Sequence, residues 1–353
     1  MRVCYFGDYN PEYARNRVIA KGVGNHRISV IKCHSQDRGW AKYWRLFKAH
    51  RSLSYDILLV GYSRDRWIVF LAWLIKKKPL YWDAFYSIYD SWVFDRKLTS
   101  KFHPKAWYYF LLDWLACHLA DKILLDTNAH IDYFAKTFRV KREKFVRVLV
   151  GSDGDIFYPR PEKKTSQKSK FIIHFHGKFI PLQGVEYIIQ AVKLLENEKN
   201  IAWQIIGRGQ EYRKIRRLTS QLRLDNINFI DPVPYWELPQ YINKADVCLG
   251  IFGSSGKTQR VIPNKVYEAV AMGKAVITAD TPAVREVFTD GENIVLCKAA
   301  SPDSLAEAIL FLKDNADKRV AIGRAAASLF QSKLTPAKVT EPLIESFKQT
   351  NES

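Results

Sequence analysis

The sequence has few of the residues that build disulfide or metal frameworks. Only five cysteines are present, and no two of them form a Cys-x-x-Cys pair. They are scattered along the chain as Cys4, Cys33, Cys117, Cys248 and Cys297. An odd, dispersed set argues against a disulfide framework and against a structural zinc site, and it fits a reducing compartment.

Long apolar runs are also missing. The longest stretches, 67–75 and 107–119, are shorter than the roughly 20 residues that a membrane-spanning helix needs. The opening residues MRVCYFG predict the first strand of a fold rather than a secretory leader. We therefore expect a protein without a membrane span, located in the cytoplasm.

Acidic residues are scarce relative to basic ones, and the formal net charge is +19. Residues 1–164 hold 30 basic and 16 acidic side chains, against 25 and 20 in the remainder, and they hold eight of the ten tryptophans. Such a surface binds nucleic acid or rests on an anionic membrane. No RNP pattern, zinc finger or basic leucine zipper is present, so we expect no nucleic-acid partner. Segments 40–45, 67–78 and 101–109 combine cationic and aromatic residues, and they are the expected contacts with the inner leaflet of the cell membrane.

Apolar runs alternate with helical patterns through both halves of the chain, which predicts an α/β protein with two doubly wound parallel sheets. We expect one Rossmann-like domain over 1–160, a polar linker over 161–170, a second domain over 171–331, and a C-terminal helix over 332–353 that returns to the first domain. Predicted strands lie at 2–6, 28–33, 56–60, 79–83, 122–125, 145–150, 171–176, 202–206, 227–230, 246–251, 275–279 and 294–296. Predicted helices lie at 11–22, 40–49, 64–76, 103–119, 128–137, 185–196, 210–222, 237–243, 265–272, 301–313 and 317–331. Ligands of such sheets bind at the carboxyl ends of the strands, so the active site is expected between the two domains.

Two glycine-containing turns follow predicted strands of the second half. The turn GKFIPLQG holds Gly177, Lys178, Gln183 and Gly184 and ends at a predicted helix, whose first backbone N–H groups attract phosphate. An ordinary strand-to-helix loop is the alternative interpretation. The second turn, IIGRGQ, holds Gly207, Arg208 and Gly209 and is not a full G-x-G-x-x-G motif.

The segment PNKVYEAVAMGKAVI carries the most chemical information. Pro263 is followed by Asn264, a natural N-cap, and by a short predicted helix over 265–272. Glu268 lies about one turn inside this helix, and its carboxylate suits a ribose diol, while Lys265 and the free amides at the helix start suit a diphosphate. A capping carboxylate paired with a nearby lysine is the alternative.

These three motifs, in this order, resemble the nucleotide-sugar half of the family 4 retaining glycosyltransferases, which have the GT-B fold. The resemblance covers about residues 171–297 and extends more loosely to the N-terminal half. It implies Glu268 as the ribose ligand. Lys178 stands at a family arginine, Gln183 at a family lysine, and Arg260 at the first glutamate of the family's Glu-x7-Glu signature.

In the N-terminal half, Asp83 stands where the family has a histidine. We expect Asp83 to face the reacting carbon or the acceptor hydroxyl, with a buried structural aspartate as the alternative. Gly7 follows the first strand, and Arg15 or Arg17 is expected to touch a phosphate, the alternative being a solvated helix face. With Asp83, the predicted catalytic residues are Lys178, Lys265 and Glu268.

The resemblance implies transfer of a sugar from a UDP- or GDP-linked donor to a glycan or lipid-linked acceptor, with retention of configuration and without a cofactor. We identify no Asp-x-Asp cluster in the sequence that would hold a metal on a diphosphate, so no metal site is predicted. A sugar-nucleotide epimerase of the same fold and a non-catalytic basic binding protein remain the alternatives.

Overall fold

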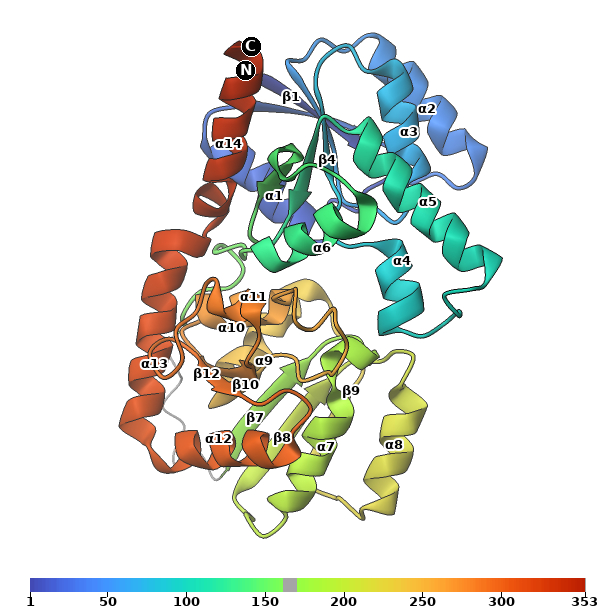
Figure 1. Ribbon diagram of the computed structural model, residues 1–353. Coiled ribbons are helices and arrows are strands. Elements are labelled where there is room, and N and C mark those ends of the chain that lie inside the picture. Colours follow the sequence, from blue (N-terminus) through green and yellow to red (C-terminus); the bar gives the residue numbers. More distant parts are fainter. Residues whose placement is uncertain (161–169, 353) are drawn as a thin grey trace. The chain divides into compact units, whose positions relative to one another are not determined.

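The computed structural model describes residues 1–160 and 170–352 and divides into two compact units (Figure 1). Unit 1 comprises Met1–Gly151 and Leu334–Ser353, and unit 2 comprises Ser152–Lys333. Residues 152–160, which the sequence grouped with the N-terminal domain, belong to unit 2, where the fully buried ring of Phe157 packs edge-on against Tyr235. Most of the predicted linker, 161–169, lies outside the described residues.

Unit 1 is built on a six-stranded parallel sheet with the strand order β2-β1-β3-β4-β5-β6. Its strands are β1 (Arg2–Gly7), β2 (Ser29–His34), β3 (Ile57–Val60), β4 (Leu80–Asp83), β5 (Lys122–Leu125) and β6 (Phe145–Arg147). Its helical segments are α1 (Ala14–Asn25), α2 (Trp40–Arg51), α3 (Trp67–Ile75), α4 (Ile88–Asp90), η1 (Ser91–Asp95), α5 (Pro104–Leu119), α6 (Asn128–Phe138), η2 (Arg142–Lys144) and α14 (Pro336–Glu352).

Both faces of this sheet are buried, because successive side chains of a strand point to opposite sides. Leu58 and Trp82 pack with the core beneath α2, α3, α5 and α6. Leu59 and Tyr81 point to the other face, where α14 lies beside α1 (Figure 1). The Tyr81 hydroxyl hydrogen-bonds to Ser346 and Thr350 of α14, so the C-terminal helix completes the core of the first unit.

Unit 2 contains a second six-stranded parallel sheet, in the order β12-β11-β10-β7-β8-β9. Its strands are β7 (Phe171–His176), β8 (Ile201–Ile206), β9 (Ile227–Ile230), β10 (Val247–Leu249), β11 (Ala275–Ala279) and β12 (Val295–Cys297). Its helical segments are η3 (Pro181–Gln183), α7 (Val185–Leu194), α8 (Tyr212–Gln221), η4 (Tyr235–Glu237), α9 (Leu238–Lys244), α10 (Asn264–Ala271), α11 (Pro282–Arg285), α12 (Pro302–Asp314), α13 (Ala316–Leu329) and η5 (Phe330–Leu334).

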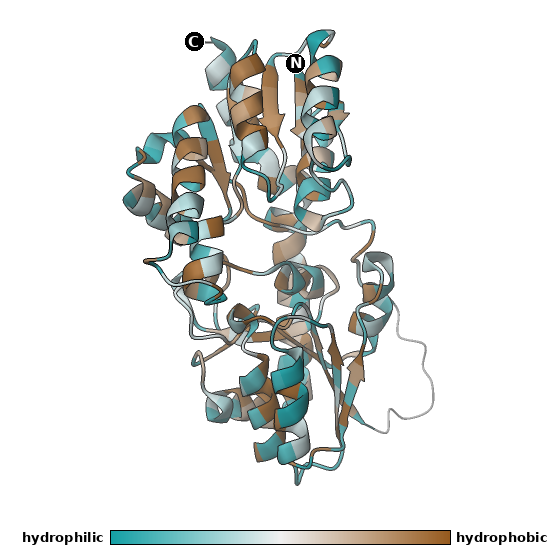
Figure 2. Cartoon of the chain, turned by 90° about the vertical axis from the view of Figure 1, so that its right-hand side faces the viewer, coloured by the Kyte–Doolittle hydropathy of each residue, from teal (hydrophilic) through white to brown (hydrophobic). Residues whose placement is uncertain are grey.

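The prediction of an α/β chain with two doubly wound parallel sheets is confirmed. The strands of both units are mainly apolar, and α8 of unit 2 is largely hydrophilic (Figure 2). In unit 2 the strand order reverses between β7 and β10, and ligands of open α/β sheets bind at such a switch point. Gly177 and Gly250 are the residues that follow these two strand ends. In the described part of the chain, no helix combines the length and the apolar character needed to cross a bilayer.

Candidate functional site

Helix α10 begins at the carboxyl edge of the unit 2 sheet. Pro263, with φ −74° and ψ 153°, is its N-cap, so the predicted N-cap Asn264 is the first helical residue and makes no side-chain capping bond. The ring of proline fixes φ near this value, which starts the helix one residue earlier than the sequence predicted. The first amides of α10 have no acceptor within the helix and form a positive end.

Glu268 is buried within α10, with 3% of its surface exposed. Its Oε2 lies 2.8 Å from Nε2 of His176, the last residue of β7. Oε1 has no hydrogen-bond partner among the residues that the structure describes. The carboxylate is therefore anchored by one oxygen, and the second oxygen is left without a side-chain or backbone partner in the described ranges.

Lys265 lies three residues before Glu268, on the first turn of α10, and is also buried. Its Nζ donates to Oε1 of Gln183 and lies 3.7 Å from the centre of the Phe175 ring. Burial lowers the pKa of Lys265 well below the ordinary lysine value, and the charge of Glu268 opposes this shift. Gln183, at the position of a family lysine, thus holds the side chain of Lys265 instead of supplying a second charge.

The glycines of the two turns allow three loops to pack closely. Gly207 has φ +141°, and a Cβ atom there would lie 1.9 Å from the carbonyl oxygen of Gly177. A Cβ atom on Gly209 would lie 2.5 Å from the carbonyl oxygen of Phe179, and one on Gly184 would lie 2.5 Å from the Gly253 nitrogen. Only glycine fits these contacts, and they fix the backbone around the site.

Three other predicted site residues lie on loops at the same edge. Lys178 is exposed on the loop after β7. Arg208 is exposed, and its Nε donates to Asp231 over 2.6 Å. Arg260 lies in the turn before α10, where its guanidinium approaches Gly256.

In unit 1, Asp83 and Arg15 bind each other. Both side chains are fully buried, with Nη2 of Arg15 3.0 Å from Oδ1 of Asp83. Arg15 also donates to the carbonyl oxygens of Val148 and Leu149. Burial raises the pKa of Asp83, and Arg15 opposes the shift. This geometry favours the structural alternative for Asp83. The fully buried Arg15 does not lie on a solvated helix face, so that alternative is wrong for it.

The remaining candidates of unit 1 follow or flank its first strand. Gly7 ends β1 with φ +130°, and a Cβ atom there would lie 3.1 Å from Ile68. Arg17 is partly exposed and pairs with Glu12 over 2.5 Å. Gly7 therefore permits close packing against α3, whereas Arg17 belongs to the outer face of α1.

Sequence reasoning missed two kinds of residue. His174 and His176 form a hydrogen-bonded chain that reaches Glu268; the signal was the alternation of two histidines with apolar residues in β7. Asp153 and Asp155 form an Asp-x-Asp pair, but Oδ1 of Asp153 accepts the backbone N–H of Asp155 in a local turn. Within the described ranges, no cluster of His, Cys, Asp or Glu side chains is arranged to hold a metal.

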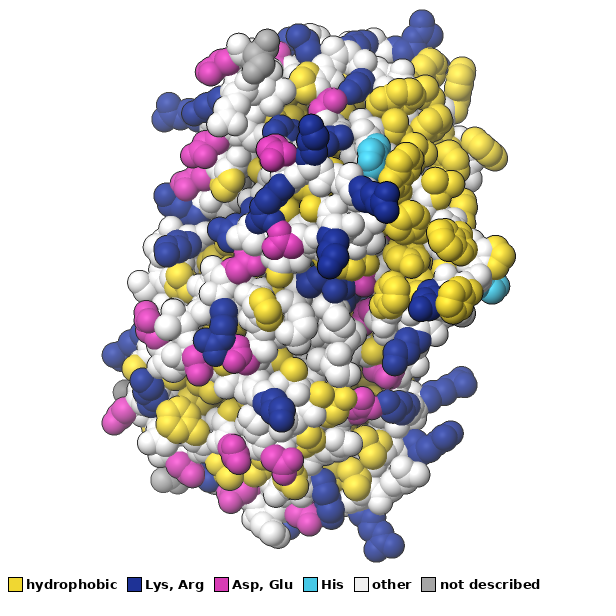
Figure 3. Space-filling model, viewed as in Figure 1, with side chains coloured by type: hydrophobic (Ala, Val, Ile, Leu, Met, Phe, Trp, Pro, Cys, Tyr) yellow, Lys and Arg dark blue, Asp and Glu magenta, His cyan; other side chains and the backbone are white. Residues whose placement is uncertain are grey.

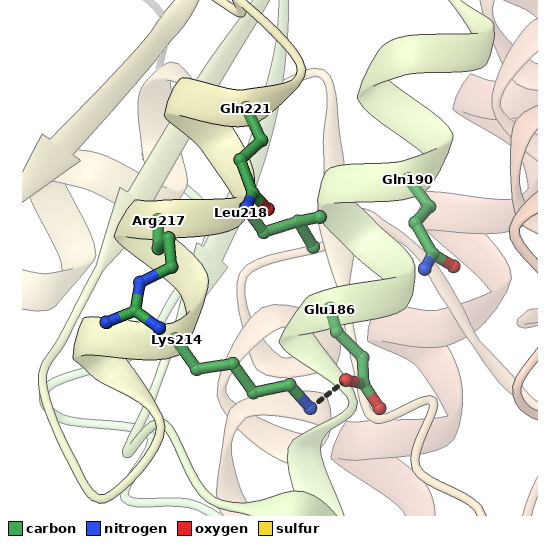
Figure 4. A pocket seen from close by; sticks show the side chains of 6 residues that line it. All are labelled: Glu186, Gln190, Lys214, Arg217, Leu218 and Gln221. Atoms are coloured by element: carbon green, nitrogen blue, oxygen red, sulfur yellow. Dashed lines mark hydrogen bonds and ion pairs between the residues drawn. The ribbon is translucent and has the colours of Figure 1, made fainter.

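A separate pocket of about 350 Å³ lies between α7 and α8 (Figure 4). It is lined by Glu186, Gln190, Lys214, Arg217, Leu218 and Gln221. Glu186 and Lys214 form an ion pair at one end of this groove (Figure 4). None of the predicted site residues lines it, so we do not include it in the candidate site.

Residues 159–329 match the model of the family Glycosyl transferases group 1. This match covers just under half of the chain, and it lies within unit 2. Uncharacterized glycosyltransferase MJ1069 of Methanocaldococcus jannaschii is 22% identical over 312 residues, which are 82% of this chain and 74% of that protein.

Solved structures resemble the chain over nearly its whole length. Sucrose-phosphate synthase from Thermosynechococcus elongatus aligns with a TM-score of 0.78 and 13% identity, covering 99% of this chain and 98% of that one. HepE of Anabaena, in complex with UDP-glucose, aligns with a TM-score of 0.75 and 15% identity, covering 99% and 100%. The predicted GT-B fold is confirmed by these likenesses.

Proposed function

We propose that the protein transfers a sugar from a UDP- or GDP-linked donor to a hydroxyl group of a glycan or lipid-linked acceptor, with retention of configuration and without a metal ion. One observation carries the proposal: Glu268 and Lys265 lie together on the first two turns of α10, Glu268 held by His176 of β7 and Lys265 by Gln183 of η3. A carboxylate for a ribose diol and a cation for a diphosphate suit one nucleotide. The UDP-glucose bound by HepE makes UDP the first nucleotide to test.

The proposed chemistry requires stabilisation of the departing diphosphate. The bond between the anomeric carbon and the phosphate oxygen breaks, and a bond from the acceptor oxygen forms on the same face of the sugar. The acceptor proton passes to the leaving phosphate oxygen. Lys265, Lys178 and the amides at the start of α10 supply the positive groups that lower this barrier, because they are already oriented before charge develops.

A thermal-shift series with UDP, GDP, ADP and their sugar conjugates tests the donor site. A ligand bound by the native state alone raises the melting temperature, so we expect a shift with UDP or GDP that disappears in Glu268→Ala. Arg285→Ala is the matched control, because Arg285 is exposed and pairs with Asp280 rather than with Glu268 or Lys265. If no nucleotide shifts the wild-type protein, the proposal is wrong.

We further propose that unit 1 rests on an anionic membrane surface and receives a membrane-linked acceptor there. Exposed apolar side chains gather over α2, α3 and α5 (Figure 3). We call this set the aromatic face; it consists of Trp40, Trp44, Trp67, Trp73, Leu74, Phe102, Trp107 and Leu111. Trp40 is 87% exposed and Phe102 is 77% exposed. Exposed patches of this kind mark interaction sites.

The positive charge around the aromatic face favours an anionic membrane surface as its partner. Segments 40–51, 67–78 and 96–109 contain lysine and arginine but no acidic residue. The Nζ of Lys101 lies 4.9 Å from the centre of the Phe102 ring, and that of Lys105 lies 4.6 Å from Trp92. Tryptophan prefers the membrane interface, and each nearby cation adds about 1 kcal/mol of attraction to anionic lipid.

Vesicle flotation tests this surface. We expect the protein to float with phosphatidylglycerol vesicles, and Trp44→Ser combined with Trp107→Ser to reduce the bound fraction severalfold. Trp236→Ser is the control, because Trp236 is 67% exposed in unit 2, outside the aromatic face. Equal loss in the control, or no flotation of the wild type, contradicts the membrane proposal and leaves the donor site unaffected.

A further inference from the structure

Strand β7 carries two buried histidines beside the donor site. His174 and His176 are two residues apart, so their side chains point to the same face of the sheet. Only 1% and 8% of their surfaces are exposed. Buried polar groups of this kind destabilise a fold unless they are hydrogen-bonded, so their partners decide their role.

Their partners form one continuous chain that ends at the candidate site. His174 Nδ1 lies 2.8 Å from Oε1 of Gln204, its register neighbour on β8. His174 Nε2 lies 2.9 Å from His176 Nδ1, and His176 Nε2 lies 2.8 Å from Glu268 Oε2. The chain therefore links β8, β7 and α10 through side chains alone.

The protonation state of each ring decides which atoms of this chain donate hydrogen bonds and which accept them. Burial and the neighbouring His176 lower the pKa of His174 well below the ordinary histidine value, which favours the neutral ring. A neutral imidazole offers one N–H and one lone pair, and it can join one donor to one acceptor. The Gln204 amide can present either its oxygen or its NH2 group, and it closes the far end of the chain.

We propose that His174 and His176 are positioning residues for the donor site: His176 Nε2–H donates to Oε2 of Glu268 and aims Oε1 at the ribose hydroxyls of the nucleotide. His174 fixes the rotation of the His176 ring, and Gln204 fixes His174. A glutamate side chain has three rotatable bonds, and a carboxylate pinned at one oxygen loses less freedom when a ligand binds. The inference rests on the proposed nucleotide-binding function and deepens it.

The residues proposed to recognise the ribose and those proposed to recognise the diphosphate are held by different partners. The histidine chain contacts Glu268, whereas Lys265 is held by Gln183 and Phe175. Loss of the chain should therefore weaken recognition of the ribose and leave recognition of the diphosphate in place. A merely structural role for the histidines would weaken both equally.

Calorimetric titration with UDP and with 2′,3′-dideoxyuridine diphosphate tests the positioning role of the two histidines. We expect wild type to bind UDP at least about tenfold more tightly than the dideoxy ligand, the size of one charge-assisted hydrogen bond. His176→Phe should remove most of this preference and retain the wild-type affinity for the dideoxy ligand. His176→Gln, whose amide can still donate, should restore part of the preference. Glu268→Ala serves as the reference for its complete loss.

His118→Phe is the matched control, because His118 lies exposed at the end of α5 in unit 1. Equal weakening of both ligands in His176→Phe, or unchanged UDP affinity, overturns the positioning role. A wild-type protein that binds neither UDP nor GDP overturns the proposed function itself. The two failures are thus distinguishable.

Discussion

The ammonium group of Lys265 has an unusual environment for a lysine. It donates to a neutral amide and lies over the Phe175 ring, and no carboxylate lies within ion-pair distance in the described ranges. Desolvation thus favours the neutral amine, which explains the lowered pKa. A diphosphate placed beside this amine would favour the protonated form and raise the pKa again.

This reversal predicts a pH dependence with a defined sign. Between the lowered pKa of the free protein and the higher pKa of the complex, binding takes up a proton, so UDP affinity should fall as pH rises through that window. Calorimetry in buffers of different ionisation enthalpy measures both the fall and the proton uptake. Lys265→Met should abolish both effects; an unchanged slope in this variant would assign the proton to another group.

The same shift acts on stability. The unfolded chain has an ordinary lysine, so it binds more protons than the folded chain at pH values between the lowered and the ordinary pKa. The free energy of unfolding therefore rises with pH across this window through Lys265. Ligand affinity and stability thus change in opposite directions with pH.

The buried ion pair of Asp83 and Arg15 should contribute strongly to stability. Asp83→Asn leaves the Arg15 guanidinium buried without its counter-charge, and we expect a loss of about 3–5 kcal/mol in the free energy of unfolding, measured with urea. The double replacement Arg15→Met with Asp83→Leu should recover much of the loss, because it removes both charges. Normal stability of Asp83→Asn with lost turnover would instead place Asp83 in the chemistry.

The sequence predicted which segments form strands better than it predicted where each strand ends. Buried parallel strands are short apolar runs, which is why 122–125, 171–176 and 227–230 match β5, β7 and β9. The strand predicted over 145–150 ends at Arg147, and the next carbonyls accept bonds from Arg15. That partner is remote in sequence, so a local apolar pattern cannot reveal where pairing stops.

Two further elements depend on remote partners. The segment Ile88–Asp95 forms α4 and a π-helical turn, which the sequence did not predict; Ser87 and the amide of Tyr89 bind the buried carboxylate of Asp113 in α5. At the donor site, spacing and glycines predicted Lys265, Glu268 and the turns. The histidine chain was missed because the alternation of histidines with apolar residues in β7 does not reveal their partners, which lie on the neighbouring strand and on α10.

Helix α14 is an element whose contribution can be measured. Phe347 is fully buried and packs edge-on against Tyr81 of the central strand β4. We expect Phe347→Ala to lower the free energy of unfolding by about 3–5 kcal/mol. Phe311→Ala, at an exposed position of α12, is the control and should change it by no more than about 0.5 kcal/mol. Equal effects of the two replacements would show that α14 does not stabilise unit 1.

At the scale of the whole molecule, the excess of positive charge accompanies the aromatic face in sequence. Residues 1–164 carry most of the net +19 and eight of the ten tryptophans. Electrostatic attraction is long-ranged and brings a protein to an anionic bilayer, whereas aromatic insertion acts only on contact. The two contributions can therefore be separated by salt.

We expect added salt to weaken vesicle binding without abolishing it. Raising ionic strength from about 0.1 to about 1 M shortens the Debye length from about 10 to about 3 Å, which screens the lysines but not the apolar contacts. Co-sedimentation with phosphatidylglycerol vesicles measures the bound fraction, and phosphatidylcholine vesicles serve as the uncharged control. Binding that is independent of salt would show that the positive charges do not contribute to vesicle binding.

The return of the chain to unit 1 has a consequence for synthesis on the ribosome. Unit 2 is one continuous stretch, Ser152–Lys333, whereas unit 1 needs the C-terminal segment to cover one face of its sheet. The first residues to leave the ribosome must therefore wait, with Leu59 and Tyr81 uncovered, until Leu343 and Phe347 have been made. The half of the protein that is translated first is thus the half that finishes folding last.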